Sequence, residues 1–528
     1  MDEPPKKRQK YPTFRIELRG DDCQKESLQQ KMHKAQNGLQ KMSSKNVTKY
    51  DLIEAAIESL LEKQGETKNA NACEYPTSFI QISKNDSNSE NIFVSTESAI
   101  HKALDISKHH ARFCELDLRS KKCSKRGHVI SCSMQCKNGH TYQWSSSPYI
   151  EGTDSYLVNQ RILFGYLTSG MLPSKYERFT DASGIGTIHR SRRSDLLDTF
   201  RKSVQVEYDK DIQKARLIEI GLSSNDFLEE QPIDILTDAR HGCRKNAKDT
   251  SVVAIGDKSH RIIACEHITK TDCKTTQKHE LIGSKRIAEN LKNENIAIGV
   301  WAHDYNTSLN KYVRELPEPT VNQNETWHGV KNLKKELVKV TKGPKYKEGK
   351  TWHSQLQDKV DPIATHFQYC MRSCGGDAQK LKDSIDTIIP HYKNNHENCK
   401  EESRCRTDVK YEPSRIVITD PKAEHLLKSA IEKSIIYRNP HCFCRAKDTF
   451  YVESFNNTIL MFADKRIHFS DKEYLMRTQL AALHWNQNVD RDYTSVTPVL
   501  HSRAMHKNLK KCSFSYRENI WKTYLSIL

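Results

Sequence analysis

The sequence predicts an α/β fold: a mixed sheet interrupted by a helical insertion and preceded by a helical segment and a small cysteine-rich β module. Short apolar runs between residues 233 and 301 have the length and composition of strands. Apolar residues recur at helical spacing before and after these runs. Cysteines and histidines gather between residues 114 and 140, with β-branched and aromatic residues between them. A chain of 528 residues has room for about three domains.

The composition excludes two classes of protein and favours a third. The chain carries 84 Lys and Arg against 67 Asp and Glu, a net charge of +17, which favours a polyanionic partner such as DNA or RNA. An anionic membrane surface is the weaker alternative. No apolar run approaches the roughly 20 residues of a spanning helix, so we expect no membrane protein. Six Trp, 21 Tyr and 15 Phe are too many apolar anchors for a fully disordered chain.

The pattern divides the chain into successive segments, for which the following boundaries are expected. They are a disordered basic tail (1–45), a small helical segment and linker (46–106), a cysteine and histidine β module (107–150), a helical module (151–228), the first part of the sheet domain (229–345), a helical insertion (346–445), the last part of the sheet domain (446–490) and a C-terminal tail (491–528).

The basic tail predicts a nuclear protein. The cluster Pro5–Lys10 is typical of a nuclear import signal, although a solvated basic tail is the alternative. No apolar segment of a secretory signal follows Met1, so we expect the 16 cysteines to be thiols or metal ligands rather than disulfides. Farther along, apolar residues at helical spacing predict an amphipathic helix over 49–63.

The β module carries candidate zinc ligands. The spacing Cys132-x3-Cys136-x3-His140 is close to that of zinc sites, which take four sulfur or nitrogen ligands. The favoured set and its competitors are Cys114, Cys123, Cys136 and His140, with Cys132 and His128 as alternatives. A β-hairpin with buried free thiols, which pack as small apolar groups, is the other interpretation.

The helical module has two clear helices, over 156–167 and 194–220, separated by a turn at Gly184–Gly186. In a basic protein this helix-turn-helix-like order is compatible with DNA reading, and Arg192 and Arg193 are candidate DNA contacts. A helical packing module is the alternative.

The sheet domain shows a change of period. The predicted elements are strands over 233–238, 251–255, 261–265 and 296–301, a turn at 256–259 and a helix over 281–292. Three strands, a helix and a further strand, with acids at strand ends, form the opening of an RNase H-like domain. After the mostly helical residues 326–437, helices over 449–465 and 474–485 complete it.

Three acids of this domain are candidate catalytic residues. Asp238 ends the first strand, Asp304 follows the fourth, and Glu453 lies near the start of a late helix. Carboxylates converging from separate elements are the hard ligands that Mg²⁺ prefers. Two such ions about 3.5–4 Å apart activate the attacking oxygen and stabilise the leaving one at phosphorus. Asp234 competes for the first position, and an ordinary turn or cap role is the alternative for each acid.

Residues 154–490 resemble eukaryotic DDE-type cut-and-paste transposases and their domesticated derivatives, with a broad likeness to the hAT and Mutator-like groups. The stretches that carry the resemblance are Thr237–Arg240, Trp301–Asp304, Glu325–Leu333, His366–Asp377, and Glu453 with Met476–Leu483. The resemblance implies an RNase H-like core with a helical insertion, a DNA substrate, a homo-oligomer, and strand cleavage and joining with two Mg²⁺ or Mn²⁺ ions. It also implies that Asp238, Asp304 and Glu453 are the catalytic acids.

Two positions depart from the family pattern. Ala239 stands where a glycine is expected after the first acid, and Glu325 stands where an aspartate is expected two residues before Trp327. These departures keep open the alternative of a catalytically inactive nuclear protein that binds DNA or chromatin. A metal-dependent nuclease with the same core, differing only in substrate, is a further alternative.

The insertion carries a second candidate zinc site and a basic face. His391, His396, Cys399 and Cys405 have a spacing that fits four zinc ligands, and Cys442 and Cys444 are further candidates. Scattered surface residues are the alternative.

The lysines that follow residue 330 are candidate contacts to a phosphate backbone, which weaken steeply with salt. The candidates are Lys331, Lys334 and Lys335. A merely solvated face is the other interpretation.

Overall fold

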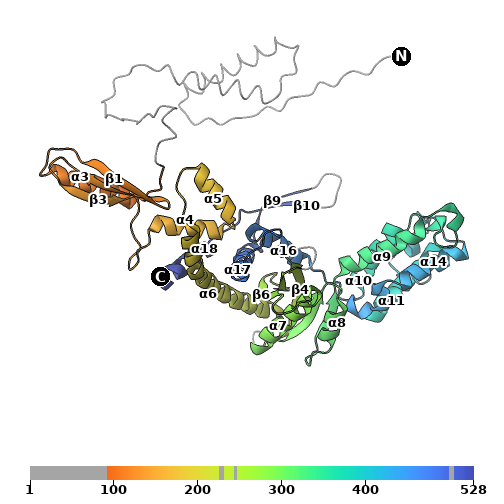
Figure 1. Cartoon of the computed structure of the whole chain (residues 1–528). Helices are drawn as coiled ribbons and strands as arrows, with labels where there is room; N and C mark the ends of the chain where they lie inside the picture. Colours follow the sequence, from red (N-terminus) through yellow and green to blue (C-terminus); the bar gives the residue numbers. More distant parts are fainter. Residues whose placement is uncertain (1–91, 225–230, 243–246, 499–504) are drawn as a thin grey trace, which may run out of the picture. The chain divides into compact units, whose positions relative to one another are not determined.

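The computed structural model describes residues 92–224, 231–242, 247–498 and 505–528 (Figure 1). The chain divides into two units, Met1–Ser89 and Glu90–Leu528, and the second is described here. The predicted import signal and the helix predicted over 49–63 lie outside the described residues.

A five-stranded mixed sheet forms the centre of the second unit, in the order β6-β5-β4-β7-β8. The strands are β4 (Ile233–His241), β5 (Asp249–Gly256), β6 (Ile262–Thr269), β7 (Ile298–His303) and β8 (Val321–Asn324). β4, β5 and β6 pair antiparallel in sequence order, whereas β7 lies parallel to β4 and β8 parallel to β7. The mixed α/β class is therefore confirmed.

β8 was not predicted, because its sequence Val-Asn-Gln-Asn is polar. Three of its four residues are nevertheless buried. Gln323 donates to the His441 carbonyl (2.8 Å) and accepts from the Arg445 amide (3.0 Å), while Asn322 donates to Asn310 (2.7 Å). Amides that find such partners can be buried, so a strand need not be apolar.

Helices pack against both faces of the sheet. α7 (His279–Asn293) and α8 (Thr307–Arg314) pack around the buried Trp301 of β7. A second core contains the remaining helices of the sheet domain, which are α4 (Leu157–Thr168), α5 (Pro173–Ala182), α6 (Arg190–Ser223), α16 (Phe450–Phe462), α17 (Asp471–Asn488) and α18 (Tyr516–Ile527).

The C-terminal segment, expected as a tail, belongs to this second core. Ile520, Trp521 and Tyr524 of α18 are buried, and the Tyr524 ring stacks on Phe200 of α6 at 3.9 Å. Their spacing places them on one helix face, which is how an amphipathic helix docks. Before α18, β9 (Tyr493–Pro498) and β10 (Met505–Leu509) form an antiparallel hairpin.

α6 does not have the form of a short DNA-reading helix. It extends over 34 residues, and one face of it, including Phe200, Val204 and Tyr208, is buried in the second core. This buried face is what the packing-module alternative predicts, because α6 packs against β4 and β6 of the sheet.

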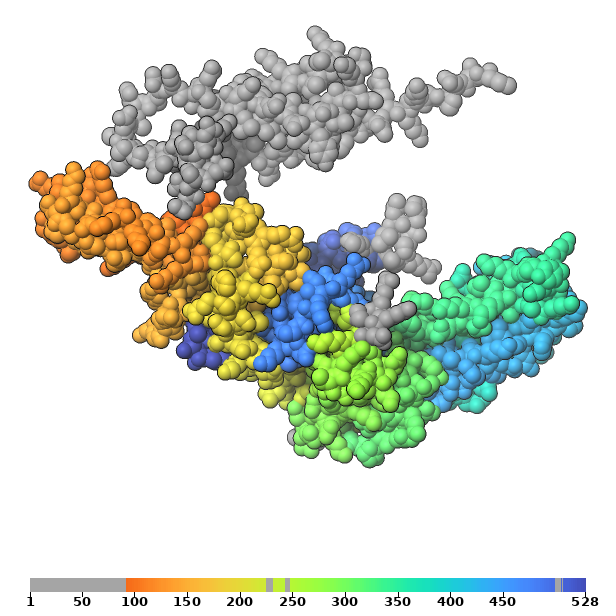
Figure 2. Space-filling model, in the orientation of Figure 1, coloured from red at the N-terminus to blue at the C-terminus, as the bar shows by residue number. Residues whose placement is uncertain are grey.

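The insertion has its own apolar core, which includes Leu333, Phe367, Leu427 and Phe443. Its helices are α9 (Thr326–Thr341), α10 (Val360–Ser373), α11 (Ala378–Asp386), α12 (Ile388–Tyr392), α13 (Arg404–Thr407), α14 (Pro421–Glu432) and α15 (Ile435–Arg438). Short 3₁₀ turns lie at Thr276–Lys278, Lys345–Lys347, Ser354–Leu356 and Pro440–Cys442. Figure 2 shows the insertion as one continuous body coloured from green to light blue.

The N-terminal module of the described unit is small. Helix α3 (Glu97–Ala111) precedes an antiparallel sheet of β1 (Arg119–Arg126), β2 (Val129–Gln135) and β3 (Thr141–Ser145). Every residue of β1 is exposed. An apolar cluster beneath this sheet contains the buried residues Val129, Tyr156 and Val158, so the module has little core of its own.

Arg477 of α17 joins three parts of the second core. It is fully buried, pairs with Glu473 at 2.9 Å, and donates to the carbonyls of Phe462 (2.7 Å) and Gly170 (3.3 Å). Gly170 allows this close approach, because a Cβ on it would meet the Met461 carbonyl at 2.1 Å. The charge of Arg477 is thus compensated where the turn after α4 meets the end of α16.

We predict that Arg477→Met destabilises the chain by about 3 kcal/mol, because it leaves Glu473 and several carbonyls without their partner. Urea unfolding of the whole chain, followed by tryptophan fluorescence, measures this change. Arg466→Met is the matched control, since Arg466 lies exposed in the segment between α16 and α17. An equal loss in both variants would contradict the assignment.

Candidate functional site

Asp238 and Asp304 emerge at the same edge of the sheet. β4 and β7 are parallel neighbours in which Thr237 lies opposite His303, so the acids that follow these residues are adjacent. Burial raises the pKa of Asp304 to about 6, and the negative charge of Asp238 adds to the rise. The pKa of Asp238 is raised as well, chiefly by burial. Two carboxylates thus repel each other where the pairing of β4 with β7 stops. The prediction that Asp238 ends its strand is corrected, because β4 continues to His241 alongside β5.

α16 brings the third predicted acid to this edge. Asn456 donates to Asp238 Oδ2 at 2.8 Å, and the Ala239 amide donates to Oδ1 at 2.7 Å. Glu453 lies one turn before Asn456 and therefore on the same helix face. Burial and the charges of Glu325 and Asp238 raise the pKa of Glu453. The structure therefore brings Asp238, Asp304 and Glu453 within electrostatic reach of one another.

Two further residues lie between these acids. Glu325, which is 4% exposed, directly precedes α9, and its carboxylate contacts Nδ1 of His328. The same nitrogen is 3.4 Å from Asp304 Oδ1, and one ligand atom from each of the three residues lies within 4.8 Å of the others. From the sequence, Glu325 is only a departure from the family pattern. The signal for its role was the Glu325-x2-His328 spacing at a helix start.

Glu280 was missed entirely. It lies in the first turn of α7, where burial and the charges of Asp238 and Asp304 raise its pKa to about 7. Asn306 donates to its Oε2 at 2.8 Å. Nothing in the local sequence distinguishes Glu280 from an ordinary glutamate at a helix start, where the helix dipole stabilises a negative charge.

Asp234, the competitor for the first position, has a structural role. Its carboxylate accepts from the Val300 amide at 3.0 Å and pairs with Lys447 at 3.1 Å, and Lys447 also pairs with Asp257. Because the charge of Asp234 is neutralised by Lys447, Asp238 is the better candidate metal ligand. His303, which precedes Asp304, is buried and hydrogen-bonded to Asn322 at 2.9 Å.

A pocket of about 340 Å³ adjoins the acids. Glu325 and Glu453 line it together with Trp327, Arg372 and Phe450. Half of the Trp327 surface is exposed, and Lys331 Nζ lies 4.1 Å from its ring centroid. The site therefore has open space on the side where α9 and α16 begin.

The predicted DNA contacts differ in how they are placed. Lys331, Lys334 and Lys335 lie on α9, and Lys334 pairs with the exposed Asp361 at 2.7 Å. Arg192 is exposed at the start of α6. Arg193, in contrast, is 7% exposed, pairs with Glu177 and lies over the Tyr176 ring, so its charge is used inside the fold. The prediction of Arg193 as a DNA contact is therefore corrected.

The candidate zinc ligands of the β module separate into two places. Cys114, Cys136 and His140 come together with His110, which the prediction did not include. Cys123 and Cys132 lie directly opposite each other on β1 and β2 and form a disulfide. The ligand set is corrected accordingly, as is the expectation that the cysteines are not in disulfides. His128 is also outside the group, because it is buried against the Tyr176 hydroxyl at 2.8 Å.

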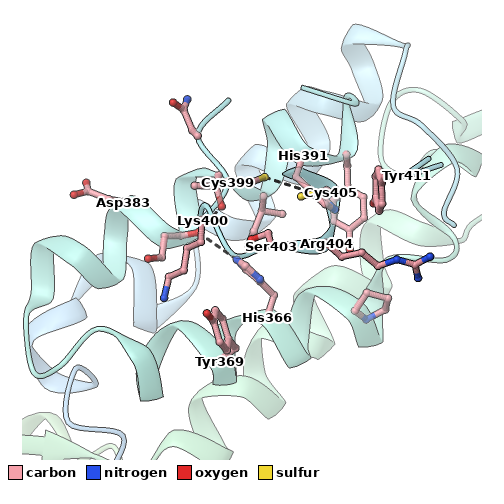
Figure 3. A pocket seen from close by; sticks show the side chains of 16 residues that line it. His366, Tyr369, Asp383, His391, Cys399, Lys400, Ser403, Arg404, Cys405 and Tyr411 are labelled. Atoms are coloured by element: carbon pink, nitrogen blue, oxygen red, sulfur yellow. Dashed lines mark hydrogen bonds between the residues drawn. The ribbon is translucent and has the colours of Figure 1, made fainter. Parts of the chain in front are cut away.

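The insertion brings its four predicted ligands together. His391, His396, Cys399 and Cys405 each offer a ligand atom within 4.8 Å of the others. Figure 3 shows His391, Cys399 and Cys405 gathered at a pocket of about 490 Å³. Cys442 and Cys444, the further candidates, are instead buried in the apolar core of the insertion.

The comparisons with known proteins agree with this architecture in part. Residues 90–290 match the family model of the Mutator-like transposase, which supports a transposase family and a transposase-related function. The match includes Asp238 and Glu280 and ends before Asp304 and Glu453. No curated protein matches the chain. Among the described residues, no helix has the length and apolarity needed to cross a membrane.

The raised acid pKa values predict how stability depends on pH. Asp304 has a pKa of about 6 in the folded chain against an ordinary 3.8, so the folded state holds its proton more tightly. Stability is therefore lost as pH rises from about 4 to about 6, and Glu280 extends this window to about pH 7.

We predict that Asp304→Asn is more stable than the parent chain near pH 8 and no more stable near pH 4. The gain is about 1 kcal/mol, since solvent screens this half-exposed group. Thermal unfolding at the two pH values measures it, with Asp195→Asn, an exposed aspartate of α6, as the control. A gain of the same size at both pH values would contradict the electrostatic origin.

Proposed function

We propose that this protein is a nuclear, DNA-binding, transposase-derived enzyme of the DDE type, with an RNase H-like core that cleaves and joins DNA strands. The observation that carries the proposal is the convergence of Asp238, Asp304 and Glu453 from three elements, with each pKa raised. Three antiparallel strands, a helix and two parallel strands support the RNase H-like core. The Mutator-like match and the resemblance to eukaryotic transposases point the same way.

The donor set fits divalent metal ions. Asp238, Asp304 and Glu453 offer hard carboxylate oxygens, which suit Mg²⁺ or Mn²⁺. Their mutual repulsion would be relieved by a bound cation. The Oδ1 atom of Asn456, which is buried beside Asp238, has no hydrogen-bond partner among the described residues. When bound, two such ions activate the attacking oxygen and stabilise the leaving oxygen.

The surrounding side chains position these carboxylates. Two donated hydrogen bonds, from Asn456 and from the Ala239 amide, fix both oxygens of Asp238 before any substrate binds. The His328 ring lies between Asp304 and Glu325 and limits the rotation of both. Pre-organised ligands reduce the rearrangement needed when the phosphate group reacts.

Ala239, the first departure from the family pattern, is accommodated within β4. It pairs with Val252 of β5, and its amide still donates to Asp238. Alanine therefore preserves the orientation of the first acid, so this position gives no reason to prefer a catalytically inactive protein.

The charge around the site suits a DNA substrate. α9 begins beside Glu325 and carries Lys331, whose positive charge lowers the pKa of Glu453 in opposition to the burial and the acidic neighbours that raise it. Lys335 lies one turn farther along the same helix face. A phosphate backbone along this face would lead to the acids.

We predict that Asp238→Asn, Asp304→Asn and Glu453→Gln each reduce strand cleavage at least about a hundredfold, because metal-held oxygens supply several kcal/mol. Nicking and strand transfer on a supercoiled plasmid in Mg²⁺ and in Mn²⁺ measure this loss. Asp195→Asn is the control.

The result separates the proposal from its alternatives. Cleavage without strand transfer would indicate a metal-dependent nuclease. Salt-sensitive DNA binding without cleavage in the parent chain would indicate a catalytically inactive DNA- or chromatin-binding protein. If Mg²⁺ also fails to raise the melting temperature of the parent chain near pH 8, the metal site itself is refuted.

We predict that Lys331→Ala combined with Lys335→Ala weakens DNA binding without changing sequence preference. Each lost phosphate contact lowers the slope of log affinity against log salt by about 0.9, so the pair lowers it by about 2. Fluorescence anisotropy of a labelled duplex over a salt series measures the slope. Lys472→Ala on α17, an exposed lysine, should leave it unchanged.

A further inference from the structure

We propose that His110, Cys114, Cys136 and His140 bind a structural zinc ion that fastens α3 to the β2–β3 connection. The site is separate from the acidic site and uses the opposite chemistry, with two sulfurs and two nitrogens in place of carboxylate oxygens. One ligand atom from each of the four residues lies within 4.8 Å of the others.

The backbone presents the ligands in two matched pairs. His110 lies in the last turn of α3, and the Cys114 amide donates to the His110 carbonyl at 3.0 Å, so one helical turn separates them. Cys136 and His140 flank a tight turn that contains Gly139 at φ +86°, and the Cys136 amide donates to the His140 carbonyl at 3.1 Å. The sequence thus contains His-x3-Cys and Cys-x3-His, two mirrored spacings that converge.

The second, independent observation is an unpaired buried nitrogen. His110 is 3% exposed, and its Nε2 has no hydrogen-bond partner among the described residues. Burying such a nitrogen without a partner opposes folding. A metal bond would satisfy this nitrogen.

The neighbouring contacts also suit metal-bound sulfur. Cys114 and Cys136 are 7% and 5% exposed, and Cys136 Sγ lies 3.4 Å from His140 Nδ1. The Asn138 side-chain amide donates to Cys114 Sγ at 3.6 Å. Outer hydrogen bonds of this kind orient metal ligands. Two soft sulfurs and two imidazoles select zinc over magnesium or calcium.

The module needs such a fastening because its core is thin. β1 is fully exposed, and the disulfide between Cys123 and Cys132 joins β1 only to β2. Nothing in that disulfide restrains α3. In small modules the free energy of metal binding contributes directly to folding.

A different observation carries a second zinc site in the insertion. There, His391 Nδ1 and His396 Nδ1 are 3.2 Å apart. Cys399 Sγ is 3.5 Å from His391 Nδ1, and Figure 3 shows these two residues close together. Asn394 Oδ1 is 3.0 Å from His396 Nε2, which leaves Nδ1 as the nitrogen for a metal. We infer that these residues, with Cys405, hold a zinc ion that fixes the segment between α12 and α14.

Zinc content of the whole chain, purified under reducing conditions and measured by plasma mass spectrometry, tests both sites. We predict two zinc ions per chain, with one lost in His110→Gln and one lost in His391→Gln. The matched controls are His109→Gln, on the exposed neighbour of His110, and His366→Gln, which lines the insertion pocket outside the ligand group. Neither control should lose zinc.

Cobalt titration of the parent chain serves if a variant fails to fold. Tetrahedral sites with thiolate ligands give strong visible and near-ultraviolet bands, and two equivalents should saturate them. A parent chain that binds neither metal overturns both sites. Full zinc content in His110→Gln overturns the first site, and full content in His391→Gln overturns the second. Loss of zinc in Cys123→Ser would overturn the four-ligand set of the first.

Discussion

Mutual repulsion among carboxylates is the constraint on which the sheet domain depends. Burial and the charges of Asp238 and Glu325 raise the pKa values of Asp304 and Glu453 at one edge of the sheet. Asp304 and Glu325 also contact one histidine, His328. Such a group disfavours folding near neutral pH, so the scaffold must supply the stability that holds it together. The apolar core around α6, α16 and α17, beside which Arg477 is buried, is the largest apolar contribution of the sheet domain to that stability.

The sequence allowed the apolar strands, and the acids Asp238 and Asp304 beside them, to be predicted from short apolar runs. The adjacency of the two acids follows from the register of β4 with β7. It could not place β8, whose amides are buried only because partners from the insertion satisfy them. Glu280 also escaped prediction, since its role arises from the distance to acids on other elements. The spacing of Ile520, Trp521 and Tyr524 is typical of an amphipathic helix, so the C-terminal helix could have been predicted in place of a tail.

Charge gave a wrong prediction at Arg193, and spacing along the chain gave a wrong one at two cysteines. A basic residue in a basic chain suggests a DNA contact, but Arg193 pairs with Glu177 and is covered by the fold. Likewise Cys132 has better zinc spacing in sequence than Cys114 has, yet the register of β1 and β2 sets it against Cys123. Only the tertiary arrangement distinguishes these cases, because spacing along the chain says nothing of the strand opposite.

The acidic site also marks the two ends of the insertion. The chain leaves the sheet at Glu325 and returns at Lys447, a few residues before Glu453, and the Thr326 amide donates to the Lys447 carbonyl at 3.2 Å. Lys447 is held to the sheet through Asp234 and Asp257. The two segments that connect the insertion to the sheet, at Thr326 and at Lys447, are therefore hydrogen-bonded to each other beside the acids. Glu325 directly precedes the first of these segments, and Glu453 follows the second. A change that separates the two segments therefore alters the distance between these two acids.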